Sequence, residues 1–382
     1  MTVRIVADQD IAALDSAFGK LGELTLRPGR SICRADLMQA DALVVRSTTS
    51  VNKDLLQGTP VRFVATATSG TDHVDRLYLQ RAGIGFADAA GCNANAVVEY
   101  VVTALSLLER DRVVDLKTSP VGIIGAGQVG SRLAVRLLQL GAVVRAHDPL
   151  LDSSSQLELQ NRGVSFCDLQ TALSCPVISL HVPLTRSGDY PTWHLLNAGR
   201  LQGLSPGTVV INTSRGDVVD GVALRKCLKQ GSRITAVLDV WENEPRPDPA
   251  LVSLATIATP HIAGYSPQAK FNATLRTATA LAEYFSLERP EAISLARQDG
   301  GRIDGALAGN DRFCAGVLSQ VLDLPTLTRS FQFSAAVSDG RVFDDMRRQL
   351  ASRQEFGAWQ VVAADLDQDR KAVLEILGFQ LA

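Results

Sequence analysis

The sequence predicts an α/β protein in which parallel sheets are covered by helices. Short β-branched runs alternate with amphipathic stretches from the N-terminus onward, which is typical of that class. One of these runs leads into a glycine-rich turn at residues 125–130, and a helical stretch follows the turn. The length of 382 residues, at roughly 150 residues per domain, allows two or three domains.

The first part of the chain contains four strand-like runs, at residues 3–7, 42–47, 61–68 and 83–88. A long helical stretch follows them at residues 96–110. It carries apolar side chains on more than one face, so we expect this helix to be buried between two bodies.

A second series of strand-like runs occupies residues 121–125, 143–148, 176–182, 208–214, 234–240 and 255–260. The helix after the first of these runs ends at Gly141, a residue typical of helix C-termini. Another helix is expected at about residues 267–287. The residues from 289 onward are rich in Asp and Arg, with a strand candidate at 358–366 and a closing helix, and they predict a separate small α/β module.

Composition and charge exclude several classes of protein. The chain is 46% hydrophobic and 20% charged, as folded proteins are. Its net charge is −2 and its basic residues are scattered, so neither nucleic acid nor a membrane surface is an expected partner. The N-terminus is typical of a first strand rather than a signal peptide, and no apolar run is long enough to span a membrane, so we expect a cytoplasmic protein.

The six cysteines predict neither disulfides nor a metal site. They lie at positions 33, 92, 167, 175, 227 and 314, without a CxxC pair or a histidine at ligand spacing. Cys92 lies between Gly91 and Asn93 and has no neighbouring base in the sequence, so we expect it to be structural.

The turn at 125–130 has the G-x-G-x-x-G spacing of dinucleotide-binding proteins, with Gly125, Gly127 and Gly130 around Gln128 and Val129. Asp148 ends the next strand, 148 − 125 = 23 residues after the first glycine, and the dinucleotide fingerprint places an acid ~20 residues on. The glycines would let the backbone approach a pyrophosphate at the helix N-terminus. The carboxylate would bind ribose hydroxyls and repel a 2′-phosphate, so the pattern favours NAD over NADP.

Polar side chains follow three further strands of the second series. Arg215 comes after 208–214, Glu244 comes after 234–240, and His261 comes after 255–260. Ligands of parallel sheets bind beyond the carboxyl ends of the strands. The arginine suits a substrate carboxylate or C2 oxygen, the histidine suits transfer of the hydroxyl proton, and the glutamate suits orientation of the imidazole. Together they predict oxidation of a 2-hydroxy acid.

The other four histidines are weaker candidates. His181 ends a strand but precedes Val182 and Pro183, so packing beside the cofactor is expected. His73 is expected to cap or brace a helix start. The sequence predicts no partner for His147 or His194.

The segments NTSRGDVVDGVAL, LDVWENEP and TPHIAGYS, with the glycine motif and its acid, resemble the D-isomer-specific 2-hydroxyacid dehydrogenase family over roughly residues 40–285. The resemblance implies a Rossmann-type NAD domain at 94–264, inserted in a flavodoxin-like substrate domain formed by 1–93 and 265–288. It also implies a C-terminal dimerisation domain at 289–382, and therefore a homodimer.

The resemblance also implies roles for single residues. Arg215, Glu244 and His261 fall on catalytic positions. Asp148, Asp239 and Gly264 fall on cofactor positions, and Ser47, Thr68 and Tyr265 fall on substrate positions. The implied substrate is a small phosphorylated hydroxy acid. Two alternatives stay open: a dehydrogenase of glycerate, phosphoglycerate or lactate, and an NAD-sensing scaffold, since proteins of that kind share this fold and trio.

Four residues depart from the family pattern, namely Thr48, Ala90, Val182 and Asp217. Of these, Asp217 is expected to point to solvent, because near Arg215 it would compete for that cation. Arg46, beside Ser47, is one candidate for the substrate phosphate. The pair Arg347 and Arg348 is another candidate, if it reaches the cleft of a neighbouring subunit. The alternative is that the pair only forms a solvated helix face.

Overall fold

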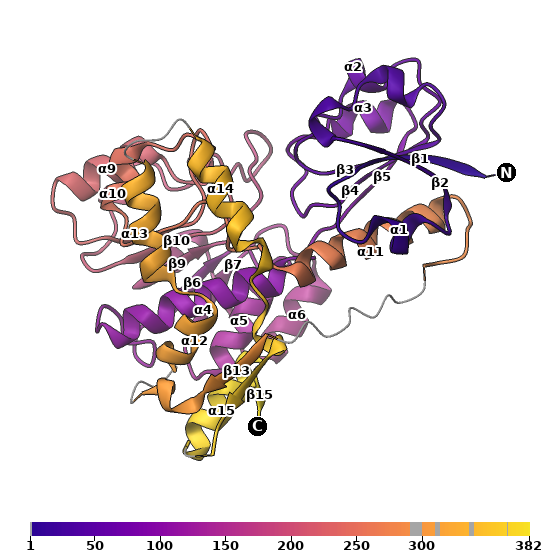
Figure 1. The fold of residues 1–382 in the computed structure, drawn as a ribbon. Coiled ribbons are helices and arrows are strands. Elements are labelled where there is room, and N and C mark those ends of the chain that lie inside the picture. Colours follow the sequence, from indigo (N-terminus) through magenta and orange to yellow (C-terminus); the bar gives the residue numbers. More distant parts are fainter. Residues whose placement is uncertain (1, 291–299, 310–313, 336–339, 365) are drawn as a thin grey trace. The chain divides into compact units, whose positions relative to one another are not determined.

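The computed structural model describes residues 2–290, 300–309, 314–335, 340–364 and 366–382 (Figure 1). The chain divides into two compact units, both of which contain parallel sheets covered by helices. The first unit comprises Met1–Asn93 with Pro267–Gln298, and the second comprises Ala94–Ser266 with Asp299–Ala382.

The first unit is built on a five-stranded parallel sheet with the order β2-β1-β3-β4-β5, which is the flavodoxin-like order. Its strands are β1 (Val3–Asp8), β2 (Gly22–Arg27), β3 (Ala42–Val45), β4 (Phe63–Thr66) and β5 (Gly85–Asp88). Its helices are α1 (Leu14–Phe18), α2 (Lys53–Leu56), α3 (Arg76–Arg81) and α11 (Pro267–Tyr284).

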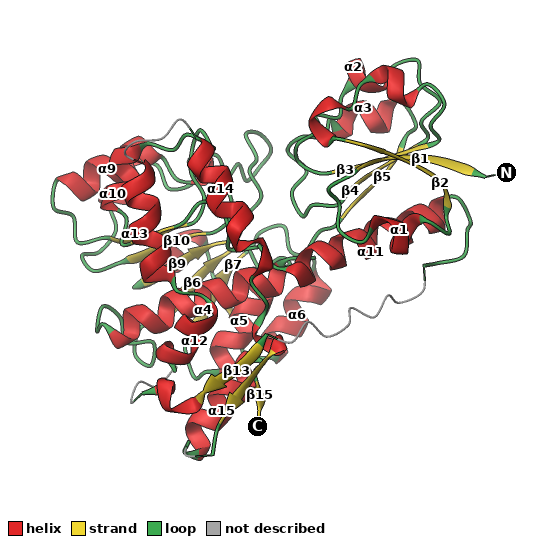
Figure 2. Ribbon diagram, viewed as in Figure 1, coloured by secondary structure: helices red, strands yellow, loops and turns green. Residues whose placement is uncertain are grey.

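Helices cover both faces of this sheet (Figure 2). One core joins α1 and α11 to strand residues such as Ile5 and Val44, and the other joins α2 and α3 to residues such as Leu43 and Val45. Because successive side chains of a strand point to opposite faces, central strands buried on both faces must be apolar throughout. This requirement explains the unbroken runs that the sequence shows in β3 and β4.

The second unit is built on a seven-stranded parallel sheet with the order β12-β11-β10-β9-β6-β7-β8. Starting from β8, the first six strands follow the 3-2-1-4-5-6 order of the Rossmann fold. The strands are β6 (Val121–Ile124), β7 (Val144–His147), β8 (Ser165–Phe166), β9 (Val177–Leu180), β10 (Val209–Asn212), β11 (Thr235–Leu238) and β12 (Ile257–Ala258).

Helix α4 (Ala94–Arg110) opens this unit and is buried along nearly its whole length, against α5 (Gly130–Gln139) and α12 (Ala315–Val321). The other helices of this part are α6 (Ser153–Asn161), α7 (Leu169–Leu173), α8 (Ala198–Gln202), α9 (Gly221–Lys229) and α10 (Pro249–Leu254). No helix in the described ranges is both long and apolar enough to cross a membrane.

The C-terminal residues add a three-stranded parallel sheet and further helices to the second unit. Its strands are β13 (Gly301–Asp304), β14 (Trp359–Val362) and β15 (Gln380–Leu381), and the helices after α12 are α13 (Leu324–Ala335), α14 (Arg341–Gln349) and α15 (Gln368–Leu377). Figure 1 shows α13 and α14 alongside the larger sheet. Helix α13 packs against β12, where the Thr328 hydroxyl accepts a hydrogen bond from Ala258 N at 3.2 Å.

The C-terminal residues therefore share a core with residues 94–266, whereas the sequence pattern predicts a separate module from 289 onward. One apolar cluster contains Ile211 and Ile257 of the large sheet together with Val317, Phe356 and Leu374. The expected boundary itself lies next to residues 291–299, which are outside the described part. Dimerisation through this region stays a prediction.

Candidate active site

The glycine turn at 125–130 has a geometry that side chains would not permit. Gly125 follows β6 and has φ +89°, and a Cβ placed there would lie 2.6 Å from the carbonyl oxygen of His181. A Cβ on Gly130 would lie 1.9 Å from the carbonyl oxygen of Gly125, so this glycine lets α5 begin directly against the turn. The space around Gly127, in contrast, is open.

Asp148 holds this turn from the neighbouring strand. It follows β7, and its carboxylate accepts Ala126 N at 2.8 Å and Leu150 N at 3.1 Å. The side chain is half-buried, so part of it remains accessible beside the exposed Gly127 and Gln128. The predicted acid therefore lies at the glycine turn, as a dinucleotide site requires.

Two further observations fit a bound dinucleotide. Val129, the N-cap residue of α5, provides no side-chain cap, so no capping side chain occupies the helix N-terminus where a pyrophosphate would bind. Ser131 N of the first turn donates to the carbonyl of Gly127 at 3.1 Å. The hydroxyl oxygen of Thr213, at the end of β10, is buried without a hydrogen-bond partner within the described ranges. A buried hydroxyl of this kind fits a bound polar group better than an empty site.

Strands β10, β11 and β12 are neighbours and parallel, and each leads into one member of the predicted trio. Their ends are in register, because Asn212 pairs with Leu238 and Leu238 pairs with Ala258. Arg215, Glu244 and His261 thus follow the same edge of one sheet. This arrangement depends on parallel pairing and could be anticipated from the strand pattern.

His261 and Glu244 form a direct pair. Nδ1 of the imidazole lies 2.7 Å from Oε2 of the carboxylate, and Oε1 accepts Trp241 N at 2.9 Å. Burial opposes ionisation of this carboxyl, but the His261 charge and the two hydrogen bonds outweigh it and hold the pKa of Glu244 below its ordinary value. The glutamate is therefore ionised at neutral pH, and its partner nitrogen carries the proton.

The backbone at His261 adopts the left-handed conformation, with φ 55°, which is unusual for a residue with a side chain. Asp239 secures it, since its carbonyl accepts His261 N at 2.6 Å and its carboxylate accepts Ile262 N at 2.7 Å and Ala263 N at 2.9 Å. Burial raises the pKa of Asp239, against these hydrogen bonds and the His261 charge. The side chain of Asp239 is 1% exposed, so the structure shows it anchoring the loop, and a cofactor contact stays a prediction.

Arg215 is half-buried, and its Nη1 donates to the carbonyl of Ser214 at 2.8 Å. Its own carbonyl accepts Asn212 Nδ2 at 2.9 Å, which fixes the turn after β10. Asp217 pairs with Arg186 at 3.2 Å and is about one-third exposed, so it is engaged by another cation rather than pointing freely to solvent.

The predicted substrate residues fall in both units. Ser47 and Thr68 belong to the first unit, two residues beyond the paired ends of β3 and β4, and Tyr265 belongs to the second. Ser47 is exposed, whereas the Thr68 hydroxyl donates to the carbonyl of Gly70 at 2.8 Å. The guanidinium of Arg46 pairs with two carboxylates, Asp8 at 2.8 Å and Asp10 at 2.7 Å. The sequence did not predict this pairing for a residue expected to bind phosphate.

The arginine pair of α14 separates into two environments. The Arg347 guanidinium lies 5.0 Å from the ring centre of Tyr265 and 5.6 Å from that of Phe343, within the same chain. Its charge also contributes to the lowered pKa of Glu244. Arg348 is exposed and pairs with Asp345, so only this second arginine forms the solvated face that one interpretation predicted.

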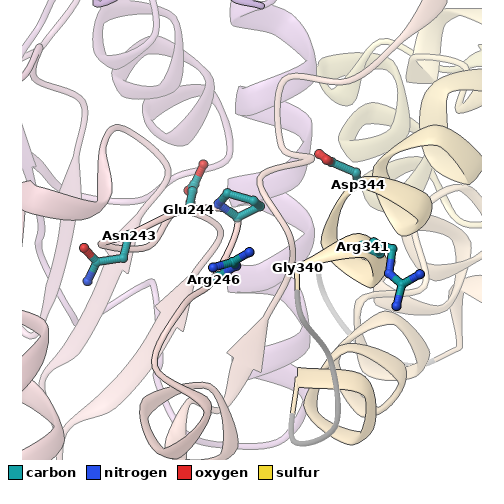
Figure 3. Close-up of a pocket in the computed structure, with 7 residues that line it drawn as sticks. Asn243, Glu244, Arg246, Gly340, Arg341 and Asp344 are labelled. Atoms are coloured by element: carbon teal, nitrogen blue, oxygen red, sulfur yellow. The ribbon is translucent and has the colours of Figure 1, made fainter.

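Glu244 also lines a pocket of about 390 Å³ between its loop and the start of α14 (Figure 3). Asn243 and Arg246 lie on the loop side, and Arg341 and Asp344 lie on the helix side. The C-terminal residues thus contribute to the surroundings of the proposed catalytic carboxylate. The sequence offers no signal for this proximity, because about a hundred residues separate the two segments.

The remaining histidines have structural partners. His181 is half-buried, with its Nε2 2.8 Å from the Ser179 hydroxyl, and desolvation lowers its pKa to about 3. His73 contacts the Thr66 hydroxyl at 2.9 Å, and the N-cap of α3 is Asp75, so His73 does not cap that helix. His147 Nδ1 lies 3.1 Å from the carbonyl of Cys167.

His194 and Glu242 form a pair that the sequence does not reveal. The imidazole Nε2 lies 2.8 Å from one carboxylate oxygen, and the other oxygen accepts Gly221 N at 3.0 Å. The ring of Trp193 stacks on His194 with a centroid distance of 3.9 Å. The pair braces the loop that carries Glu244. In the first unit, burial raises the pKa of Cys92 to about 11, which fits a structural thiol.

The family model for the NAD-binding domain of D-isomer specific 2-hydroxyacid dehydrogenases matches residues 103–263. Relatives also match the chain from end to end, and the chain belongs to the D-isomer-specific 2-hydroxyacid dehydrogenase family. Two of these relatives carry the name erythronate-4-phosphate dehydrogenase. The protein of Pseudomonas fluorescens is 42% identical over 98% of both chains, and that of Hahella chejuensis is 39% identical over 100% of both.

Solved structures show the same fold. D-lactate dehydrogenase from Aquifex aeolicus, complexed with NAD and lactic acid, is 25% identical with a TM-score of 0.64, over 74% of this chain and 96% of that one. The NAD+-bound 3-phosphoglycerate dehydrogenase of Entamoeba histolytica has a TM-score of 0.61 at 20% identity, over 75% of this chain and 96% of that one. About a quarter of this chain has no counterpart in either match. The Rossmann NAD domain expected from the sequence is confirmed, and the chain is an NAD-dependent oxidoreductase of this family.

Proposed function

We propose that this enzyme oxidises 4-phospho-D-erythronate at C2 to (R)-3-hydroxy-2-oxo-4-phosphobutanoate with NAD+, in the biosynthesis of pyridoxal 5′-phosphate. The observation that supports this chemistry is the 2.7 Å hydrogen bond between His261 Nδ1 and Glu244 Oε2. It lies at the edge of the sheet where the strand before Arg215 also ends. The relatives named erythronate-4-phosphate dehydrogenase support the choice of substrate. We further propose a cytoplasmic homodimer.

His261 acts as the base in this reaction. Because Nδ1–H donates a hydrogen bond to the ionised Glu244, the neutral imidazole presents Nε2 as a proton acceptor. Nε2 takes the C2 hydroxyl proton as the C2–H bond breaks, and Glu244 stabilises the resulting imidazolium. Arg215 binds the substrate carboxylate or the developing carbonyl oxygen. NAD+, when bound, would supply the acceptor for the hydride that leaves C2.

Residues of the glycine turn hold the cofactor. The uncapped start of α5, beside Gly125, Gly127 and Gly130, would hold the pyrophosphate. Gln128 and Val129 belong to the same turn, and Gly264 would approach the cofactor from the loop 261–265. Asp148 binds the ribose hydroxyls, and its charge disfavours the 2′-phosphate of NADP.

A cation must also bind the phosphate of the substrate. Arg347 is the better supported candidate, because it lies over Tyr265 and its charge acts on Glu244, whereas Arg46 is already bound by Asp8 and Asp10. Ser47, Thr68 and Tyr265 would bind the hydroxyl groups of the acid.

A parallel assay tests this proposal. Formation of NADH or NADPH is followed with 4-phospho-D-erythronate, 3-phosphoglycerate, D-glycerate and D-lactate, each with NAD+ and with NADP+. We expect the highest kcat/KM for 4-phospho-D-erythronate with NAD+. A higher value for another acid would reassign the substrate, and saturable NAD+ binding without turnover of any acid would favour an NAD-sensing scaffold.

A further inference from the structure

Arg353 is a buried cation that the proposed chemistry does not use directly. It lies in the C-terminal part of the second unit, and its side chain is only 4% exposed. Its Nε donates to the carbonyl of Tyr265 at 3.0 Å, and its Nη1 donates to Glu99 Oε2 at 3.1 Å. Its Nη2 lies 3.4 Å from the carbonyls of Ala96 and Ala263. One guanidinium thus joins the first turns of α4 to the loop that follows the catalytic histidine.

The residues next to Arg353 reinforce the same connection. Phe356 N donates to the second oxygen of Glu99 at 2.8 Å. The Ser266 hydroxyl donates to Glu355 Oε1 at 2.6 Å. Segment 353–356 is therefore fixed at several points to residues just inside the second unit, close in sequence to where the chain enters and leaves it.

The loop 261–265 needs support from both sides of its backbone. The left-handed conformation of His261 costs free energy and persists only where its surroundings impose it. Asp239 binds the N–H groups of residues 261, 262 and 263. Arg353 binds carbonyls of the same loop, at Ala263 and Tyr265. The two residues are thus complementary: the Asp239 carboxylate accepts from the N–H groups of Ile262 and Ala263, and its carbonyl accepts from that of His261, whereas Arg353 donates to the carbonyls.

Arginine suits this task better than lysine. The planar guanidinium has five donors in a fixed fork, so it can bind Glu99 and several carbonyls in different directions at once. Lysine would retain the charge but could not reproduce that geometry.

We propose that Arg353 is a positioning residue for catalysis: it fixes the backbone that presents His261, Gly264 and Tyr265 to the reacting molecules. The inference rests on the function proposed above. It gives the C-terminal residues a role within the catalytic centre of their own chain, since they hold the loop that bears the base.

The test separates positioning from simple stabilisation. Arg353→Met alone leaves the Glu99 carboxyl, whose pKa burial raises to about 8, buried without its cation, and is expected to lower Tm. The double variant E99Q/R353M removes this ionisable group, so we expect it to recover most of the lost Tm. Its kcat should nevertheless stay reduced by about 10- to 100-fold, because misplacing a reacting group by ~1 Å costs about that much.

Two further variants complete the design. Arg353→Lys should keep Tm near that of the wild type, while its kcat should lie between the values of E99Q/R353M and the wild type. Arg348→Met, an exposed arginine of α14, is the matched control and should change neither value. If kcat of E99Q/R353M returns to the wild-type value together with Tm, Arg353 is a structural residue and the inference is overturned.

Hydrogen exchange distinguishes this failure from failure of the proposed function. Amides of residues 261–265 should exchange faster in E99Q/R353M than in the wild type, whatever substrate the enzyme uses. Wild-type protein that does not oxidise 4-phospho-D-erythronate would refute the proposed function while leaving the exchange test valid. Unchanged exchange in this segment would refute the positioning role.

Discussion

His261 combines the proposed base with an unusual backbone conformation. We expect His261→Asn to lower kcat by ~10²- to 10⁴-fold, the usual contribution of a general base. NAD binding should persist, because the glycine turn and Asp148 are unchanged by this substitution. The measurement is single-turnover NADH formation alongside NAD binding by calorimetry. Near wild-type turnover would show that this histidine is only a satisfied polar group.

His181 gives the fold a dependence on pH. Burial lowers its pKa to about 3, from an ordinary value of 6.5, so the folded protein keeps it neutral while the unfolded chain protonates it below pH 6.5. Its contribution to stability is therefore complete above pH 6.5 and is lost as pH falls toward 3. Between pH 6.5 and 4.5 the loss should be ~2 kcal/mol, since one pKa unit corresponds to about 1.4 kcal/mol.

Comparison with His181→Gln isolates this effect. Unfolding by denaturant at pH 7, 6, 5 and 4.5 should show a steeper fall in the free energy of unfolding for the wild type than for the variant. Parallel curves for the two proteins would mean that His181 is not the group responsible.

At the scale of elements, the loop between β11 and α10 is held on two sides. Glu244 faces His261, whereas Glu242 faces His194 and Gly221 N. We expect Glu242→Gln to lower the free energy of unfolding by about 1–2 kcal/mol, as the loss of a charged hydrogen bond does. It should also lower kcat several-fold without changing KM for NAD, because Glu244 loses part of its support.

Glu283→Gln is the matched control for that substitution. Glu283 is exposed and pairs with Arg289 on the surface of the first unit, where an ion pair contributes little. If both substitutions reduce kcat equally, support of the Glu244 loop does not explain the effect.

Most strands could be predicted from the sequence, whereas β2, β8 and β15 could not. The runs that become β3, β4, β6, β9 and β10 are buried at every position, and apart from Thr66, Ser179 and Asn212 their residues are apolar or glycine. Strand β2 lies at a sheet edge and has only exposed and half-buried residues, without regular alternation, so nothing in GELTLR distinguishes it from a loop. Strands β8 and β15 have two residues each, too few for any periodicity.

The site divides in the same way. Arg215, Glu244, His261 and Asp148 were predictable because each follows a recognisable strand of a parallel sheet. The partners of His194 and Arg353 lie 48 and 254 residues away in sequence, and only tertiary packing brings them together. The neighbours of Arg46 and Arg347 are likewise brought close only by tertiary packing, so the sequence could not predict them.

For the whole molecule, the decisive feature is that the C-terminal residues are packed into the second unit. Helix α13 covers the edge strand β12, and its Gln332 donates to the carbonyls of Val252 at 3.2 Å and Ala255 at 2.9 Å. Arg136 of α5 donates to the carbonyl of Leu377 at 2.7 Å. An edge strand without such a cover is prone to pair with other chains.

Removal of residues 299–382 should therefore damage the NAD-binding unit rather than merely prevent dimerisation. The shortened chain would expose the apolar surfaces of α4 and β12 that α12 and α13 now cover. We expect it to aggregate on size-exclusion chromatography and to bind NAD at least tenfold more weakly than the full chain, since a partly unfolded population reduces apparent affinity in proportion. A soluble monomer with undiminished NAD affinity would instead show that these residues serve only to join two subunits, as an independent dimerisation domain would.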